Sequence, residues 1–301
     1  MAILTNPQLV EAPSPGRLRY GVFTAARLTD DLDARTVASG FQFPAEDCGV
    51  ARLYDANCDT NPTKTFDEFL GYVAGDPYWV YATHKCGSVG RTPQEIERTV
   101  RRKLAGAEQQ RVEAAIWGGT SPPVDPALTT TAAVVTVTPD APGAGAAIAA
   151  LEQSFYDAYG YIGTIHINTR AYAALTYAEL ISDTPSAGVL TTPLGSQWSI
   201  GSGYGTDGPA GVPATAGSVW AFMTPPVWIR RMPQPIVPDV TATMDRLHNQ
   251  YLALAERVYA HTWACPIVHA VQVPITAPFS GGEVPIPDVP GDVEELVTEE
   301  V

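Results

Sequence analysis

Histidines and nearby acids are the residues of this 301-residue chain with the chemistry for acid–base or metal catalysis. The five histidines are His84, His166, His248, His261 and His269. If His261 and His269 met Asp245 or Glu256 in space, they would suit a hydrolase or a metalloenzyme. A lone strand histidine is more often a hydrogen-bonded core or surface residue. We therefore expect no catalytic residue, no metal site and no cofactor, and keep an enzyme only as an alternative.

The segment GYGTDG, Gly203 to Gly208, has the G-x-G-x-x-G spacing of a dinucleotide-binding loop. Such a loop must open a helix whose N-terminus faces the phosphates. Pro209, Gly211 and Pro213 follow and prevent a helix from opening there. The segment is therefore predicted to be a tight loop. The sequence has no Walker-type phosphate loop, G-x-S-x-G elbow, H-E-x-x-H pair or EF-hand loop.

The four cysteines are Cys48, Cys58, Cys86 and Cys265, and no two of them form a C-x-x-C pair. This spacing matches no zinc-binding pattern. In a cytoplasm the thiols would be reduced, and a free cysteine behaves mainly as a small apolar residue. We expect four reduced, buried, structural thiols.

Arginines stand beside aromatic or acidic residues at three places. The segment WIRRM contains Trp228, Arg230 and Arg231, a combination enriched at protein interfaces, although a solvated strand end explains it equally well. In AER, at the expected helix–strand junction near 255, Arg257 beside Glu256 is expected to pair with a carboxylate and fix the corner. Arg101 and Arg102 lie on the charged face of a long predicted helix, which is either solvated or a binding surface.

The charge of the chain limits its partners. It has 18 basic and 32 acidic residues, a formal net charge of -14. Such a protein repels phosphate backbones, which argues against sequence-specific nucleic-acid binding but suits a container for nucleic acid. The first residues lack the basic region of a signal peptide, and no apolar run approaches the roughly 18 residues of a membrane span. We expect a protein made in a cytoplasm, with no membrane partner.

The strongest predicted element is a helix within RTPQEIERTVRRKLAGAEQQRVEAAIWGG, residues 91–119. Thr92 is a suitable N-cap, Pro93 suits the first helical position, and Glu95 completes a capping box. Gly118 is the expected stop. The apolar stripe that should face the core consists of Ile96, Val100, Leu104, Ala107, Val112, Ala115 and Ile116.

The other elements are predicted from period and punctuation. Strands are expected at 77–86, 132–138, 161–168, 217–224 and 226–232, with the last two paired. Helices are expected at 65–73, 143–160, 169–181 and 239–255, with Asn168 or Thr169 as the cap of the third. Residues 1–40, with three prolines and few periodic apolar positions, suggest an extended arm that lies on its own domain or on a neighbour. Residues 279–301 form an acidic, extended tail.

The order of these features resembles the major capsid proteins of tailed bacteriophages, which share the Hong Kong-type capsid fold with encapsulin shells. The resemblance is carried by PYWVYATHKC followed by the capped helix (77–119), by TPLG with the glycine-rich loop after it, and by AERVYAHTW. It covers roughly residues 40–275 and is strongest to capsid proteins of phages that infect actinobacteria. The segment AERVYAHTWACPIVHAVQV, 255–273, is then a wall element and not the floor of an active site.

The resemblance implies an α+β fold with five parts. These are an N-terminal arm at 1–40, an extended-loop region at 41–90, a peripheral domain at 91–160 and 231–278 with a spine helix at 92–117, an axial domain at 161–230, and the acidic tail at 279–301. It implies a protein that assembles with itself, as hexamers and pentamers, into an icosahedral head that encloses double-stranded DNA. Scaffolding, portal and decoration proteins are further candidate partners, and the location is the virion, after assembly in the host cytoplasm.

Candidate assembly-interface or structural residues share aromatic or charged side chains at expected surfaces. They are Trp79, Tyr81, Arg101, Arg102, Trp228, Arg230, Arg231, Glu256 and Arg257. An encapsulin-type shell and another virion structural protein, such as a tail-tube or head-completion component, remain alternatives. Deletion of residues 1–30 is expected to leave a folded subunit that assembles poorly.

Overall fold

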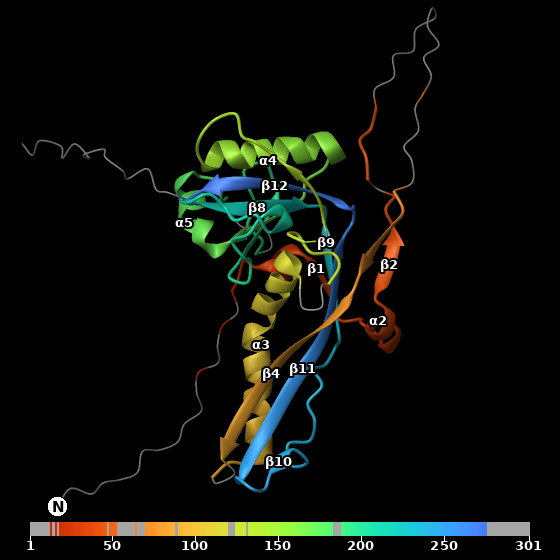
Figure 1. Ribbon diagram of the computed structural model, residues 1–301, viewed down its shortest axis with the longest axis vertical. Helices are drawn as coiled ribbons and strands as arrows, with labels where there is room; N and C mark the ends of the chain where they lie inside the picture. The colour runs from red at the N-terminus through yellow and green to blue at the C-terminus, as the bar shows by residue number, and fades with distance from the viewer. Residues whose placement is uncertain are drawn as a thin grey trace, which may run out of the picture.

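The computed structural model describes residues 13, 16, 18–46, 48–52, 64, 70–87, 90–119, 124–130, 132–182 and 188–275. These residues form a mixed α+β structure with two five-stranded sheets and one two-stranded sheet (Figure 1), which confirms the expected fold class. The acidic tail, Cys58 and most of the helix expected at 65–73 lie outside the described residues. The described end of that helix, residues 70–73, is not helical.

The first sheet is built around β11 (Gln250–Trp263), a strand long enough to have different partners along its two edges. β4 (Pro77–Gly87) pairs antiparallel along one edge, from Gly87 opposite Gln250 to Pro77 opposite Ala260. The other edge pairs with β10 (Met244–Asp245) and then with β9 (Val227–Arg231), and β1 (Arg27–Thr29) adds parallel to β9. The β4–β11 ribbon, residues 77–87 and 250–260, extends away from the second sheet (Figure 1).

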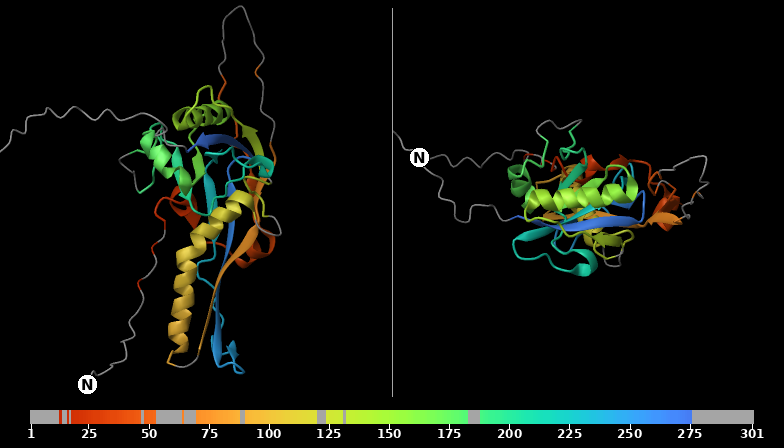
Figure 2. Two further views of the ribbon diagram at one scale, coloured as in Figure 1. Left: turned by 60° about the vertical axis from the view of Figure 1, so that its left-hand side comes forward. Right: turned by 90° about the horizontal axis from the view of Figure 1, so that it is seen from above.

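Helix α3 (Pro93–Gly118) lies along this ribbon (Figure 2). Its start is the predicted capping box, with the Thr92 hydroxyl accepting from the Glu95 amide and the Glu95 carboxylate from the Thr92 amide. Gly119 at φ 74° follows the last turn. The predicted stripe is buried except for Ala107, which is exposed. Glu108 is buried in its place because two arginines and a tyrosine surround its carboxylate.

The second sheet has the order β5–β12–β8–β6–β7. Its strands are β5 (Ala133–Thr136), β12 (Ile267–Pro274), β8 (Ser218–Thr224), β6 (Thr164–Asn168) and β7 (Gln197–Gly201). The β12–β5 and β6–β7 pairs are parallel, whereas β8 is antiparallel to both of its neighbours. The sheet thus joins segments that the sequence analysis assigned to the axial domain with two, β5 and β12, that it assigned to the peripheral domain.

Helix α4 (Ala144–Tyr159) covers one face of the second sheet and ends, as predicted, at Gly160 in the left-handed conformation (Figure 2). Ile148, Leu151 and Phe155 are fully buried against the sheet. The third predicted helix is shorter than expected, a 3-10 turn η1 (Thr169–Ala171) followed by α5 (Tyr172–Tyr177). Its cap is Asn168, whose side chain accepts from the amide of Arg170 at 3.0 Å. The glycine-rich loop after β7 contains only the 3-10 turn η2 (Pro209–Gly211), as the tight-loop interpretation requires.

Residues 18–40 differ from the extended arm that was expected. They form α1 (Val22–Ala25), β1 and α2 (Ala34–Ser39), and Val22 and Leu32 are buried in the core of the same chain. The chain then enters the small sheet of β2 (Phe41–Pro44) and β3 (Tyr72–Gly75), which are antiparallel. Deletion of residues 1–30 would therefore remove core residues as well as an arm.

Two predictions for the last third of the chain are wrong. Residues 239–255 are not a helix, because β10, turns and the first part of β11 occupy them. β8 and β9 are not paired with each other, because the chain passes from the second sheet to the first between Thr224 and Val227. The connection from β11 to β12 also crosses between the sheets, at residues 264–266.

Candidate functional site

The predicted arginines of β9 hold residues 27–41 onto the sheet of their own chain. Arg231 forms an ion pair with Asp30, and this contact holds the pKa of the Asp30 carboxyl below its usual value. Arg230 Nε lies 3.1 Å from Asp31 Oδ1, and its Nη2 donates to the Asp31 carbonyl oxygen at 3.0 Å. The strand pairing of β1 with β9 supplies the backbone part of the same attachment.

Trp228 lies beside Arg230 on β9 and completes this attachment. Its indole Nε1 donates to Thr29 Oγ1 at 3.0 Å. Its ring packs edge-on against Phe41, with 5.5 Å between centroids, and the guanidinium of Arg27 lies 5.0 Å from its ring centre. The WIRRM segment therefore attaches residues 27–41 to β9 within one chain.

Glu108 is a buried carboxylate that the sequence analysis missed. Its Oε2 accepts from Arg257 Nη1 at 3.1 Å and from the Tyr259 hydroxyl at 2.7 Å, and Arg231 lies 3.7 Å from Oε1. Burial, with Glu108 next to it, raises the pKa of Tyr259 well above its usual range. The carboxylate predicted for Arg257 thus comes from α3, and it fixes the middle of β11 instead of a helix–strand corner.

The outer face of the β4–β11 ribbon carries exposed aromatic residues. Trp79 and Tyr81 alternate with buried Tyr78 and Val80, so that one face of β4 packs under α3 and the other faces outward. The side chains of Trp79 and Tyr81 are 49% and 67% exposed. Leu252, paired across the ribbon with Lys85, adds a further 43% exposed apolar side chain on β11.

The remaining candidates on α3 and β11 are less informative. Arg101 forms an i,i+4 ion pair of 2.8 Å with Glu97 on the solvent side of α3, and Arg102 is half-buried on the same helix. Glu256 exchanges two backbone hydrogen bonds with Ile236, which ties the segment after β9 to the edge of β11. The exposed ion pair between Arg101 and Glu97 contributes at most about 1 kcal/mol to stability.

The buried histidines each have structural hydrogen-bond partners. His261 contacts the Tyr78 hydroxyl (3.1 Å) and the Pro126 carbonyl oxygen (2.7 Å), and burial lowers its pKa to about 4. His269 is 2.8 Å from Ser154 Oγ, and burial lowers its pKa. The exposed His248 bonds to Asp245 at 2.7 Å, and Glu256 pairs through its backbone with Ile236. Among the described residues, the hydrogen bonds of His261 and His269 go to groups other than these two acids.

His166 belongs to a second buried polar group, between β6, β7 and the glycine-rich loop. Its ring nitrogens lie 2.9 Å from the Tyr204 hydroxyl and from Thr224 Oγ1, and burial lowers its pKa to about 3. Glu113 of α3 lies close by and accepts from the amides of Val22 (3.3 Å) and Gly203 (3.0 Å). Burial raises the pKa of Glu113 in spite of these donors. The group joins the N-terminal segment, α3 and the loop.

Cys48 and Cys265 form a disulfide across 217 positions of sequence, which corrects the expectation of four reduced thiols. Cys86 is a free thiol, as predicted, but it is half-buried and not buried. Sequence spacing carries no information about such a pairing, because the two residues meet only when the β11–β12 connection packs beside the segment after β2.

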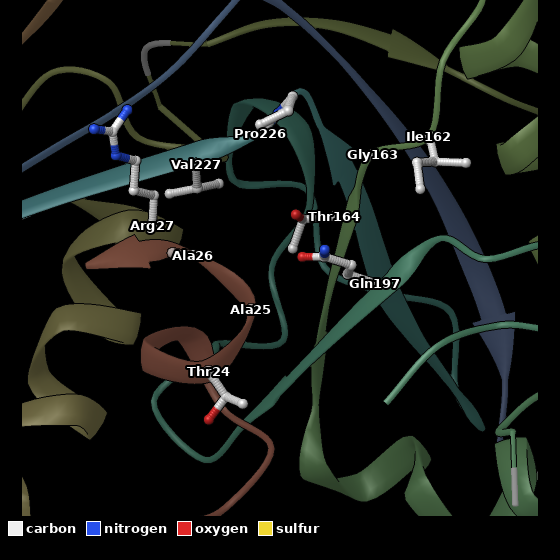
Figure 3. Close-up of a pocket in the computed structure, with 10 residues that line it drawn as sticks. All are labelled: Thr24, Ala25, Ala26, Arg27, Ile162, Gly163, Thr164, Gln197, Pro226 and Val227. Atoms are coloured by element: carbon white, nitrogen blue, oxygen red, sulfur yellow. The ribbon is translucent and has the colours of Figure 1, made fainter. Parts of the chain in front are cut away.

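A cleft of about 360 Å³ lies between the two sheets (Figure 3). β1 and β9 contribute Arg27 and Val227, while β6 and β7 contribute Thr164 and Gln197. Its ten lining residues include no histidine, cysteine or acid, so they offer no general base and no soft metal ligand. Among all the described residues, no cluster of three potential metal ligands occurs, and no helix has the length and hydropathy to cross a membrane.

Comparison with known proteins was informative at the level of structure. No family model and no curated protein matches the sequence. The capsid protein of a native GTA particle is 11% identical, with a TM-score of 0.53 over 90% of this chain and 96% of that one. The capsid protein of Ralstonia phage GP4 is 8% identical, with a TM-score of 0.51 over 92% and 97%.

A non-viral shell protein is similar to the same degree. The SrpI encapsulin of Synechococcus elongatus is 11% identical, with a TM-score of 0.50 over 90% of this chain and 94% of that one. At such low identity the similarity establishes the fold alone. This chain has the fold of phage capsid and encapsulin shell proteins, as the order of its sequence motifs predicted.

Proposed function

We propose that this chain is a major capsid protein, which assembles with itself into the icosahedral head of a phage. The observation that carries the proposal is the end-to-end similarity to the GTA and Ralstonia phage capsid proteins, which covers at least 90% of this chain and 96% of theirs. The narrower resemblance to capsid proteins of actinobacterial phages stays a prediction. So do hexamers and pentamers, and scaffolding, portal and decoration partners.

The charge of the chain supports a container for nucleic acid. A net charge of -14 keeps the wall from adhering to packaged double-stranded DNA, which is enclosed without sequence-specific contacts. The location follows from the function: the virion, after assembly in the host cytoplasm. The acidic residues 279–301 are proposed to bind a neighbour or a decoration protein, or to keep the shell soluble.

We assign the parts of the subunit by its two sheets. The first sheet with α3 is proposed as the peripheral domain, and the second sheet with α4 as the axial domain. This assignment places β5, α4 and β12 in the axial domain, because β5 and β12 belong to the second sheet and α4 shares a core with it. The connection between β2 and β3 is proposed as the extended loop, and residues 1–17 as the arm.

A shell protein works through the area that its subunits bury against one another, which must exceed the roughly 1,600 Å² of an ordinary complex. Trp79 and Tyr81 are proposed as one part of that area. Their side chains are about half or more exposed on a rigid ribbon, and aromatic residues of this kind dominate the energetics of interfaces. The half-buried Arg102 is a weaker candidate.

Electron microscopy of the purified, expressed full-length chain tests the function. Closed shells are expected. Rings or tubes would instead indicate a tail-tube or head-completion protein. Shells that co-purify with a protein cargo and contain no genome would indicate an encapsulin-type compartment. One result would contradict a shell of any kind. The protein would stay monomeric at every concentration tested and would have a hydrolase activity that mutation of His261 or His269 abolishes.

Paired variants test the ribbon. Trp79→Ser with Tyr81→Ser should lower the yield of shells at least about tenfold while the melting temperature of the unassembled subunit changes little, because both side chains are exposed. Trp79→Phe with Tyr81→Phe keeps most of the apolar area and should assemble nearly as well as the unaltered chain. Normal assembly of the serine pair would remove these residues from the proposed interface.

A further inference from the structure

We propose that the Cys48–Cys265 disulfide is a redox-controlled clamp on the connection between β2 and β3. Cys48 stands four residues beyond the end of β2, at the beginning of that connection. Cys265 lies in the turn from β11 to β12, where the chain passes from one sheet to the other. The bond therefore joins the described start of that connection, residues 45–46 and 48–52, to the junction of the two sheets.

A backbone hydrogen bond ties the first residue of this connection to the small sheet. The amide of Ala45 donates to the carbonyl oxygen of Gly71 at 3.0 Å, which closes the end of the small sheet. Beyond that point Glu46, Gly49 and Val50 are exposed, and Cys48 is the residue that packs on the core below α4. Reduction of the disulfide removes the covalent part of that attachment and leaves Cys48 held by packing and by the contact of its sulfur with the Ala264 carbonyl oxygen, at 3.6 Å.

The two sulfur atoms differ in access, and this difference sets the chemical route. Cys265 is fully buried, with the Tyr161 hydroxyl 3.4 Å from its sulfur, whereas Cys48 is half-buried at the surface. A small disulfide such as oxidised glutathione therefore reacts first with the Cys48 thiolate, forming a mixed disulfide and releasing one glutathione thiolate. The Cys265 thiolate then attacks the Cys48 sulfur and releases the second glutathione. Two protein thiols and one oxidised glutathione thus yield one protein disulfide and two reduced glutathiones.

The order of events follows from the redox conditions. A chain made in a reducing cytoplasm begins with both thiols free and the connection loosely held. It becomes clamped when the particle meets an oxidising medium. In a shell, the clamp would leave residues 45–52 without a covalent link during assembly and would fix them afterwards. This consequence rests on the proposed function. The clamp itself does not, because both cysteines belong to one chain.

The test uses the full-length chain with reduced or oxidised glutathione. Peptide mass spectrometry should find a Cys48–Cys265 linked peptide only in the oxidised protein. Hydrogen exchange at residues 45–52 should be about tenfold faster in the reduced protein, because local opening no longer has to carry Cys265 with it. Cys48→Ser should exchange at the reduced rate in both buffers. Cys86→Ser, which removes the one free thiol among the described residues, should behave like the unaltered chain.

Three outcomes would overturn the clamp. They are the absence of the linked peptide after oxidation, equal exchange at 45–52 in both buffers, and a Cys48→Ser variant that still responds to glutathione. All three readouts work on unassembled subunits and on shells alike. Failure of the clamp with normal closed shells would leave the capsid function standing, and a responsive clamp in a protein that forms no shells would do the reverse.

Discussion

Acid should destabilise the folded chain through two buried histidines, of which His261 is the better test. Its Nδ1 lies 3.1 Å from the Tyr78 hydroxyl and its Nε2 lies 2.7 Å from the Pro126 carbonyl oxygen. A neutral ring with its proton on Nε2 satisfies both contacts, because Nδ1 then accepts from the tyrosine. A second proton would place a charge in a fully buried site. Burial accordingly lowers the pKa of His261 to about 4 and that of His166 to about 3.

The sign follows from the difference between the folded and the unfolded chain. In the unfolded chain these rings have an ordinary pKa near 6.5, so the unfolded chain takes up protons first as the pH falls. The free energy of unfolding is therefore fully retained above pH 6.5, declines below it, and levels off only near the folded pKa. For His261 the loss between pH 7 and pH 5 is about 2 kcal/mol, and His166 adds a loss of about the same size. Together they remove a large share of a typical stability of about 5–15 kcal/mol.

Urea unfolding of the unassembled subunit at pH 7, 6 and 5 measures this loss. His261→Gln should be less stable than the unaltered chain at pH 7, but its further loss at pH 5 should be smaller by about 2 kcal/mol, because one titrating group is gone. His248→Gln is the matched control, since His248 is exposed and should leave most of the loss in place. An equal loss in His261→Gln and in the unaltered chain would show that His261 does not carry the acid sensitivity.

Two further predictions concern single positions. Glu108→Gln should lower the free energy of unfolding by about 3 kcal/mol, because Arg257 and Arg231 would lose the buried carboxylate that they share; a loss below 1 kcal/mol in urea titration would contradict that role. Gly203→Ala should cost about 2 kcal/mol or more, since its new methyl group would overlap the carbonyl oxygen of Gln110, whereas Gly145→Ala, in open space within α4, should raise the melting temperature slightly; equal melting temperatures for the two variants would refute the packing argument.

Residues close together in sequence were sufficient to predict the elements whose ends have capping or helix-stopping residues. The capping box at Thr92, the proline after it and the glycine after Tyr159 defined α3 and α4 to within one or two residues. These features depend on hydrogen bonds and backbone angles within a few residues of one another. The aromatic and β-branched residues of PYWVYATHKC likewise predicted β4.

Long-range contacts decided the places where prediction failed. Residues 251–257, YLALAER, are rich in helix-forming leucine, alanine and glutamate, but pairing with β4 over eleven positions makes them a strand. Ala107 was expected to be buried, but Glu108 is buried in its place. The partners of Glu108 come from β9 and β11, more than a hundred residues away in sequence. The same distance in sequence hid the Cys48–Cys265 bond. Local propensity contains none of this information.

The two crossings between the sheets limit how the subunit can adapt to different neighbours. Strands β8–β9 and β11–β12 pass from one sheet to the other through short connections, and the cleft of Figure 3 lies beside the first of them. Because both crossings are short and continue directly into paired strands, a rotation of one sheet against the other would break backbone hydrogen bonds at two places at once. The body should therefore move as one unit. If the chain assembles as proposed, adjustment to different neighbours would then have to occur in segments outside the two sheets.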